Sequence, residues 1–230
     1  MQTVKFFAIA ALSAAVILPA SAVAMETPDD RLSYTIGMDI GQSLAEQGID
    51  INLDLLLEGL RAAYAGEETR LTQEEALAER DAFMQRRQQQ MEQERGQQSV
   101  RNLEEGQAFL AENRGNPEVS ETPSGLQYRV IEAGTGRSPS ATDQVTVHYR
   151  GTLINGVEFD SSYARGEPAT FALNQVIPGW TEGVQLMQEG STYEFFIPAD
   201  LAYGEQGRPG PIGPNSTLIF QVELIEVHGN

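Results

Sequence analysis

Residues 147–162 read VHYRGTLINGVEFDSS, and this stretch decides the fold of the C-terminal half. Val147 and Tyr149 alternate with polar residues, which is typical of a strand with one buried face. Asn155-Gly156 separates Thr152-Leu153-Ile154 from Val157-Glu158-Phe159. An Asn-Gly pair between two such runs predicts a β-hairpin with a tight turn.

The same alternation continues on both sides of this hairpin. It recurs upstream in Leu126, Tyr128 and Val130, and two later runs, 192–197 and 217–227, also have the composition of strands. Between the hairpin and the later runs, residues 180–187 form a short amphipathic segment that we expect to be a helix ended by Gly190. The pattern predicts an α+β fold, in which an antiparallel sheet is covered by one helix.

A long polar helix is predicted upstream, over residues 72–113. Thr72 and Glu75 have the spacing of a capping box, and the residues that follow are mostly Gln, Glu, Arg and Ala, which favour helices. A helix that is polar on nearly all sides bridges domains. Gly96 and Gly106 are candidate points of bending. A disordered Gln-rich linker is the alternative.

Residues 29–66 predict two further helices with more apolar surface than they can bury against each other. Leu32, Ile36, Ile40 and Leu44 recur every four residues, and a leucine-rich helix follows and ends at Gly66. Fewer than about 40 residues rarely fold alone. A second copy of the same segment is the economical partner, so we expect a homodimer through residues 29–66. The alternative is that this segment packs on the C-terminal domain.

Residues 1–24 have the features of a secretory signal peptide. Lys5 precedes an apolar run, residues 6–18, that is too short to span a bilayer, and Ala22-Val23-Ala24 supplies a cleavage pattern. A buried N-terminal helix is the alternative. The sequence has no cysteine, so it lacks the attachment residue of a lipoprotein. We expect a protein without a membrane span, free in the periplasm of a Gram-negative bacterium.

Charge and composition exclude several functions. Without residues 1–24 the chain has 14 arginines against 33 acidic residues, a net charge of −19, which argues against nucleic-acid binding. The two histidines, His148 and His228, form no metal-ligand pattern and no catalytic-triad motif. We therefore expect no metal and no cofactor.

Five ordered motifs carry a resemblance to a known family. They are VHYRG, NGVEFDSS, VIPGWTEGVQLMQEG, IPADLAYGEQG and NSTLIFQVELIEV, and the resemblance covers residues 125–227. They resemble the signature of FKBP-type peptidyl-prolyl cis/trans isomerases, and the upstream helices are similar to the dimerising half of the macrophage-infectivity-potentiator branch. After the predicted signal peptide (1–24), the resemblance implies a helical dimerisation segment (25–70), a long connecting helix (71–116) and an isomerase domain (117–230), whose sheet wraps on one helix.

The resemblance also implies which residues form a prolyl pocket. The residues that match catalytic positions are Tyr149, Phe159, Asp160, Trp180 and Tyr203, and those that match substrate-binding positions are Arg165, Val176, Ile177, Ile212 and Phe220. Trp180 resembles the floor of the pocket, and Tyr203 the hydroxyl donor to the ligand. Two departures concern its walls: Ala169 replaces a common aromatic residue, so Phe171 is a candidate to fill that wall, and Pro211 replaces a branched aliphatic residue.

The implied activity is isomerisation of X–Pro bonds in unfolded or nascent secreted polypeptides, with chaperone activity beside it. Macrolides such as rapamycin are the implied inhibitors. No covalent bond changes in this reaction, which agrees with the expected lack of a cofactor. The main alternative is a peptide-binding chaperone module without catalysis, and a purely structural rod-and-dimer protein is a third reading.

Overall fold

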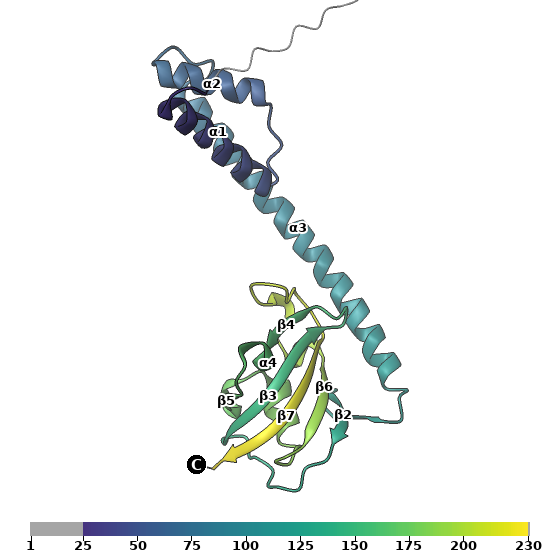
Figure 1. Cartoon of the computed structure of the whole chain (residues 1–230). Coiled ribbons are helices and arrows are strands. Elements are labelled where there is room, and N and C mark those ends of the chain that lie inside the picture. The colour runs from purple at the N-terminus through teal and green to yellow at the C-terminus, as the bar shows by residue number, and fades with distance from the viewer. Residues whose placement is uncertain (1–24, 230) are drawn as a thin grey trace, which may run out of the picture. The chain divides into compact units, whose positions relative to one another are not determined.

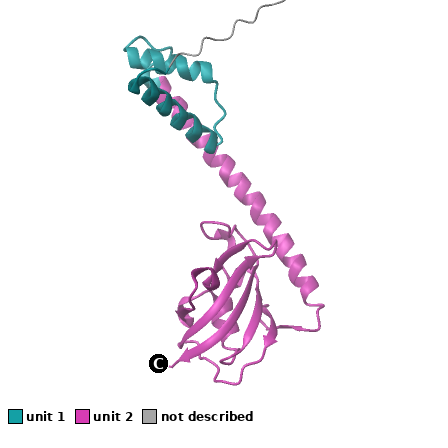
Figure 2. Ribbon diagram, in the orientation of Figure 1, with its two compact units in different colours: residues 1–74 teal, residues 75–230 magenta. Residues whose placement is uncertain are grey.

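The computed structural model describes residues 25–229, and the predicted signal peptide lies outside this range. The chain divides into two compact units, residues 1–74 and residues 75–230, which Figure 2 shows in separate colours. The first unit is helical, and the second contains the sheet (Figure 1). Within residues 25–229, none of the helices combines the length and the apolar character needed to cross a bilayer.

The first unit contains helices α1 (Pro28–Glu46) and α2 (Leu53–Ala65). Thr27 and Asp30 form a capping box at the start of α1, and the Asn52 side chain caps α2. Gly66 ends α2 in the left-handed conformation, as predicted. Neither helix has a buried residue, and their apolar side chains are exposed on the single chain.

Helix α3 (Gln73–Asn113) is continuous through both Gly96 and Gly106. A disordered linker is therefore excluded for this segment. The prediction of a helix that only bridges domains is wrong for its C-terminal part, which packs on the sheet. Gly106 is buried against Thr217, and the Phe109 ring lies 5.9 Å from that of Phe196.

The second unit contains one antiparallel sheet in the order β1-β2-β6-β7-β3-β4, with β5 paired to β3 (Figure 1). Its strands are β1 (Val119–Glu121), β2 (Gln127–Glu132), β3 (Gln144–Leu153), β4 (Glu158–Ser161), β5 (Ala169–Ala172), β6 (Thr192–Ile197) and β7 (Leu218–His228). The predicted hairpin is confirmed as β3 and β4, because Leu153 N–H donates to Val157 O across a turn with Gly156 at φ 85°. This confirms the α+β class.

Short helices connect the strands. They are α4 (Ser162–Arg165), α5 (Pro178–Val184) and the 3₁₀ turns η1 (Leu173–Gln175), η2 (Ala199–Leu201) and η3 (Gly204–Gln206). The predicted helix 180–187 is thus displaced. Pro178, whose fixed φ suits a first helical position, starts α5 two residues earlier. At the other end, Leu186 and Met187 donate to Gly183 O and Val184 O in tighter three-residue turns.

Trp180 and Val184 of α5 are buried in the core that this helix forms with the sheet. The opposite face is covered in part by α3, which explains why the alternation predicted around Leu126 breaks down. Gln127 is fully buried, donates to Leu110 O at 2.9 Å and to Glu121 at 2.7 Å, and accepts from Asn113 at 2.9 Å. A buried polar side chain is tolerated when its groups are paired in this way.

Candidate active site

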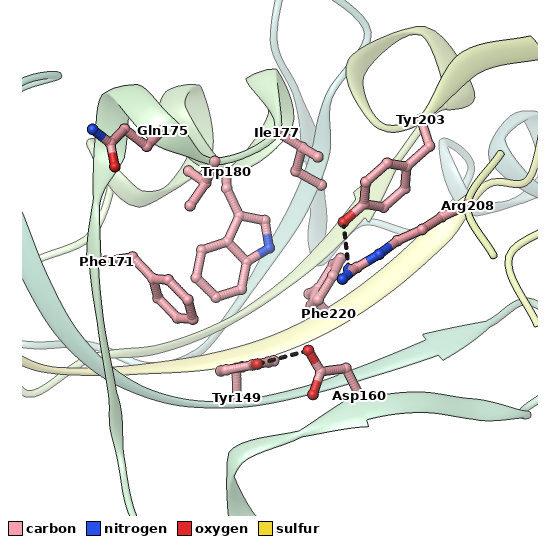
Figure 3. Close-up of a pocket in the computed structure, with 10 residues that line it drawn as sticks. Tyr149, Asp160, Phe171, Gln175, Ile177, Trp180, Tyr203, Arg208 and Phe220 are labelled. Atoms are coloured by element: carbon pink, nitrogen blue, oxygen red, sulfur yellow. Dashed lines mark hydrogen bonds between the residues drawn. The ribbon is translucent and has the colours of Figure 1, made fainter. Parts of the chain in front are cut away.

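A pocket of about 430 Å³ lies between α5, the sheet and the loop that precedes β7 (Figure 3). Strands β3, β4, β5 and β7 contribute one side chain each, and η1, α5 and the loop contribute the others. The residues that line it are Tyr149, Asp160, Phe171, Gln175, Val176, Ile177, Trp180, Tyr203, Arg208 and Phe220.

Aromatic rings form the floor and the walls of the pocket. The indole of Trp180 is the centre of this group, with ring centroids 5.3 Å from Tyr149, 5.6 Å from Phe171 and 5.3 Å from Phe220. All three pairs are edge-on, which is a favourable arrangement of aromatic quadrupoles. Trp180 is only 4% exposed, so the surrounding side chains hold its ring in place.

A polar group of three side chains closes one side of this aromatic floor. Tyr149 Oη donates to Asp160 Oδ2 at 2.8 Å, and Arg165 donates to Asp160 Oδ1 at 2.6 Å and to Tyr149 Oη at 2.7 Å. Each member contacts the other two, so the closed network fixes the rotamers of all three. It leaves the tyrosine ring facing the pocket.

This network shifts the pKa of its members in opposite directions. Burial alone would raise the pKa of Asp160, but the hydrogen bonds from Tyr149 and Arg165, together with the arginine charge, outweigh it and lower the pKa. Burial raises the pKa of Tyr149, and the neighbouring carboxylate adds to this effect against the opposing contribution of Arg165. At neutral pH the carboxyl is therefore ionised and the phenol is protonated.

The loop before β7 forms the other side of the pocket. Arg208 Nη1 donates to Tyr203 Oη at 3.3 Å, and its guanidinium lies 5.8 Å from the centre of the Tyr203 ring. Figure 3 shows this pair on the opposite side of the pocket from Tyr149 and Asp160. The pocket thus has an aromatic floor with polar hydrogen-bonding groups on two sides.

Seven of the ten residues that the sequence indicated line this pocket: Tyr149, Asp160, Val176, Ile177, Trp180, Tyr203 and Phe220. Phe159 and Arg165 lie behind the lining. Phe159 packs edge-on against Phe220 with centroids 5.3 Å apart, and Arg165 acts on the pocket through its hydrogen bonds. Ile212 is not in the lining, because the loop turns it inward into the hydrophobic core, where it is 4% exposed.

Three lining residues were not in the predicted set. Phe171 occupies the wall beside Ala169, as the sequence suggested for this departure. Gln175 and Arg208 gave no signal of their own. Arg208 is the only charged residue between Gly207 and the start of β7 at Leu218, a stretch otherwise rich in proline and glycine, and this isolation is the one feature that could have marked it.

Comparison with known proteins agrees with this geometry. Residues 135–225 match the model of the FKBP-type peptidyl-prolyl cis-trans isomerase family, and residues 29–130 match the model of the domain amino-terminal to it. The chain is 48% identical over 206 residues to the outer membrane protein MIP of Legionella longbeachae, an alignment that covers 90% of this chain and 88% of that protein. It is 47% identical over 198 residues to the probable isomerase FkpA of Neisseria meningitidis, covering 85% and 73%.

The crystal structure of FkpA from Escherichia coli superimposes with a TM-score of 0.75 at 39% sequence identity. This match covers 89% of the present chain and 99% of the other, so it includes the helical segments as well as the sheet. The chain therefore belongs to the FKBP-type peptidyl-prolyl cis-trans isomerases, in the Mip and FkpA branch, and is an enzyme of that class.

Proposed function

We propose that the pocket around Trp180 is the site at which this enzyme isomerises X–Pro bonds. The observation that carries the proposal is the edge-on packing of three rings around a buried indole, which leaves a fixed apolar floor for a pyrrolidine ring. Tyr203 and Arg208 offer donors at the rim, and Ile177 lies at the start of α5, where its N–H can meet the carbonyl after the proline.

Such a site can accelerate rotation without forming a covalent bond. Rotation about the X–Pro bond loses amide resonance against a barrier of about 18–20 kcal/mol, and uncatalysed exchange takes tens to hundreds of seconds. A twisted amide has less charge separation than a planar one, so it loses less on leaving water. An apolar pocket therefore favours the twisted form over both planar forms, and fixed donors hold the flanking chain in a turn.

Asp160 has a positioning role in this proposal. Its lowered pKa keeps it ionised at neutral pH, so it has no proton to give to the prolyl nitrogen. Its carboxylate instead holds Tyr149 and Arg165 through the hydrogen bonds described above. Phe159 supports the floor through Phe220, and Val176 and Phe171 complete the walls.

We also propose that the enzyme acts on unfolded proline-containing polypeptides in the periplasm, as a homodimer through residues 29–66. The division into segments 25–70, 71–116 and 117–230 belongs to this proposal. It is supported by the signal-peptide pattern of residues 1–24 and by the exposed apolar side chains of α1 and α2. Leu32, Ile36 and Ile40 lie on successive turns of α1 and are 58%, 50% and 40% exposed. Together they form an apolar surface that a second copy of the chain would cover. Sedimentation of residues 25–230 tests the dimer: we expect a dimer for the wild type and a monomer for Ile36→Glu. A wild-type chain that sediments as a monomer, with the same mass as the variant, would refute the proposal.

Exchange of a short X–Pro peptide, followed with and without rapamycin, tests the catalytic site. We expect the wild-type chain to catalyse exchange and rapamycin to abolish it. Tyr203→Phe removes one pocket hydroxyl and should lower kcat/KM by about tenfold, the loss of roughly one good hydrogen bond. Tyr193→Phe is the matched control, because it removes a hydroxyl that donates outside the pocket, to Leu186 O. Equal activity of the two variants would refute the role of Tyr203, and an inactive but folded wild type would favour a non-catalytic chaperone module.

A further inference from the structure

One face of the C-terminal half of α3 contacts the sheet and the loop before β7. The contacting residues are Arg95, Ser99, Asn102, Gly106, Phe109 and Asn113. Their spacing alternates between four and three residues, which places them on a single stripe of the helix. Phe109 and Asn113 lie on the sheet, whereas Arg95, Ser99, Asn102 and Gly106 lie on the loop that forms the rim of the pocket.

That loop, residues 204–217, is hereafter the flap. Its inner side provides Arg208, and Tyr203 immediately precedes it. Asn215 N–H closes its base by donating to Gly204 O at 2.8 Å, and Arg208 N–H donates to Ile212 O at 2.8 Å within it. Pro209, Pro211 and Pro214 have no N–H to donate. The other bonds within the flap are local: Gly207 N–H donates to Gly204 O at 3.3 Å, Gly213 N–H to Pro211 O at 3.1 Å and Ser216 Oγ to Gly213 O at 2.9 Å.

The outer side of the flap is held by three polar side chains of α3. Arg95 Nη2 donates to Gln206 O at 2.7 Å, and Asn102 Nδ2 donates to Pro214 O at 2.7 Å. The Asn215 side chain donates to Ser99 Oγ at 2.8 Å. These bonds join the helix to both ends of the flap, on either side of Arg208 and Ile212.

The side chains of Gln98 and Asn102 on α3 also lie directly against the backbone of Gly213 in the flap. A Cβ atom on Gly213 would lie 2.7 Å from Gln98 Nε2 and 3.1 Å from Asn102 Nδ2. On the side of the flap this contact is therefore made by backbone, and on the side of α3 by the amide ends of two side chains. A flap that is already held in its binding conformation loses less conformational entropy when a ligand binds in the pocket.

We propose that Arg95, Ser99 and Asn102 are positioning residues that hold the flap, and through it Tyr203 and Arg208, in the conformation that binds substrate. The connecting helix thereby sets the affinity of the pocket in the same chain. This inference rests on the proposed function of the pocket. Where only a fraction of the molecules has a competent flap, the apparent dissociation constant rises by the inverse of that fraction.

The test is the triple variant Arg95→Ala, Ser99→Ala, Asn102→Ala in residues 25–230. Relative to the wild type, we expect the KM for X–Pro peptide and the Kd for rapamycin to rise about three- to tenfold, while kcat stays within about twofold. This rise corresponds to a flap that has its binding conformation in roughly 10–30% of the molecules. Amide exchange at Arg208 and Asn215 should accelerate, while the amides of β3 and β7 keep their protection. These partly exposed polar residues lie outside the core, so the variant should fold.

The matched control is Gln97→Ala, Arg101→Ala, Gln107→Ala, which removes three exposed side chains and one positive charge from other faces of the same helix. It should equal the wild type in every measurement. A triple variant with wild-type KM and wild-type rapamycin affinity would overturn the inference, as would a loss confined to kcat. A wild type without turnover would count against the proposed function alone, because rapamycin affinity still reports on the flap.

Discussion

Gly183 of α5 lies against the ring of Phe195 in β6, and its replacement by alanine tests how closely the helix must approach the sheet. A Cβ atom at this position would be 2.7 Å from Cε1 and 2.9 Å from Cδ1 of that ring. Phe195 is fully buried, so the ring has no free space into which it can turn. The added methyl group must instead push α5 away from the sheet.

The expected cost follows from two opposing contributions. Overpacking of a buried site costs about 1–3 kcal/mol, and the better helix propensity of alanine returns up to about 1 kcal/mol. We therefore expect Gly183→Ala to lower the free energy of unfolding by about 1–2 kcal/mol. In a unit of this size that corresponds to a melting temperature lower by roughly 2–8 °C.

The same displacement should reach the pocket, because Trp180 lies one turn before Gly183 in α5. Calorimetry of residues 25–230 measures the first effect, and rapamycin titration measures the second, for which we expect weaker binding. Gly96→Ala is the control, since a Cβ on this glycine of α3 would meet no atom within 4 Å. A melting temperature of Gly183→Ala equal to or above that of the wild type would refute the reasoning that the helix needs glycine at this contact.

Three further predictions concern the polar groups of the same unit. Because the pKa of Asp160 is lowered and that of Tyr149 is raised, turnover should be constant from about pH 5 to pH 9. A carboxyl with a lowered folded-state pKa stabilises the fold above its unfolded value of about 3.9, so stability should fall below about pH 4, and Asp160→Asn should reduce that fall in a pH series of unfolding curves. Gln127→Leu removes the buried partner of the Asn113 amide and one of the two donors to Leu110 O, which keeps the Arg114 N–H, and urea unfolding should show a loss of about 1–3 kcal/mol; a loss under 0.5 kcal/mol would contradict the assigned pairing.

Local signals in the sequence predicted most of the elements correctly. The Asn155-Gly156 hairpin and the Gly66 helix end each depend on a few neighbouring residues, so the local sequence is sufficient to predict them. The motifs likewise indicated seven of the ten residues that line the pocket. The predicted start of the helix at Trp180 is two residues late, because the amphipathic pattern begins there whereas the fixed φ of Pro178 lets α5 begin earlier.

The parts that the sequence did not reveal depend on contacts between distant segments. Gln127 looks like an outward-facing strand residue, and it is buried only because Leu110 and Asn113 of α3 cover that face of the sheet. Ile212 is an aliphatic residue at a position that matches a substrate-binding position of the family, but the path of the flap directs its side chain into the core. For both Gln127 and Ile212, the environment of the side chain is set by contacts or by a chain path that neighbouring residues in the sequence do not reveal.

The face of α3 that holds the flap shows why hydrophobic periodicity could not find it. Its partners on the flap are the carbonyl oxygens of Gln206 and Pro214 and the side chain of Asn215, so the groups that α3 must offer are polar. Such a face has the same composition as a solvated one, and the helix is then predicted to be polar all round. A docked polar face differs from a solvated one in its spacing. Arg95, Ser99 and Asn102 are followed, at the same intervals of four and three residues, by Gly106 and Phe109. In a helix exposed on all sides, a small residue and an aromatic one would not be expected on the same face as these polar residues. A polar stripe that runs in register into a small residue and an aromatic one therefore indicates a docked helix, and here the docking surface includes the rim of the active site.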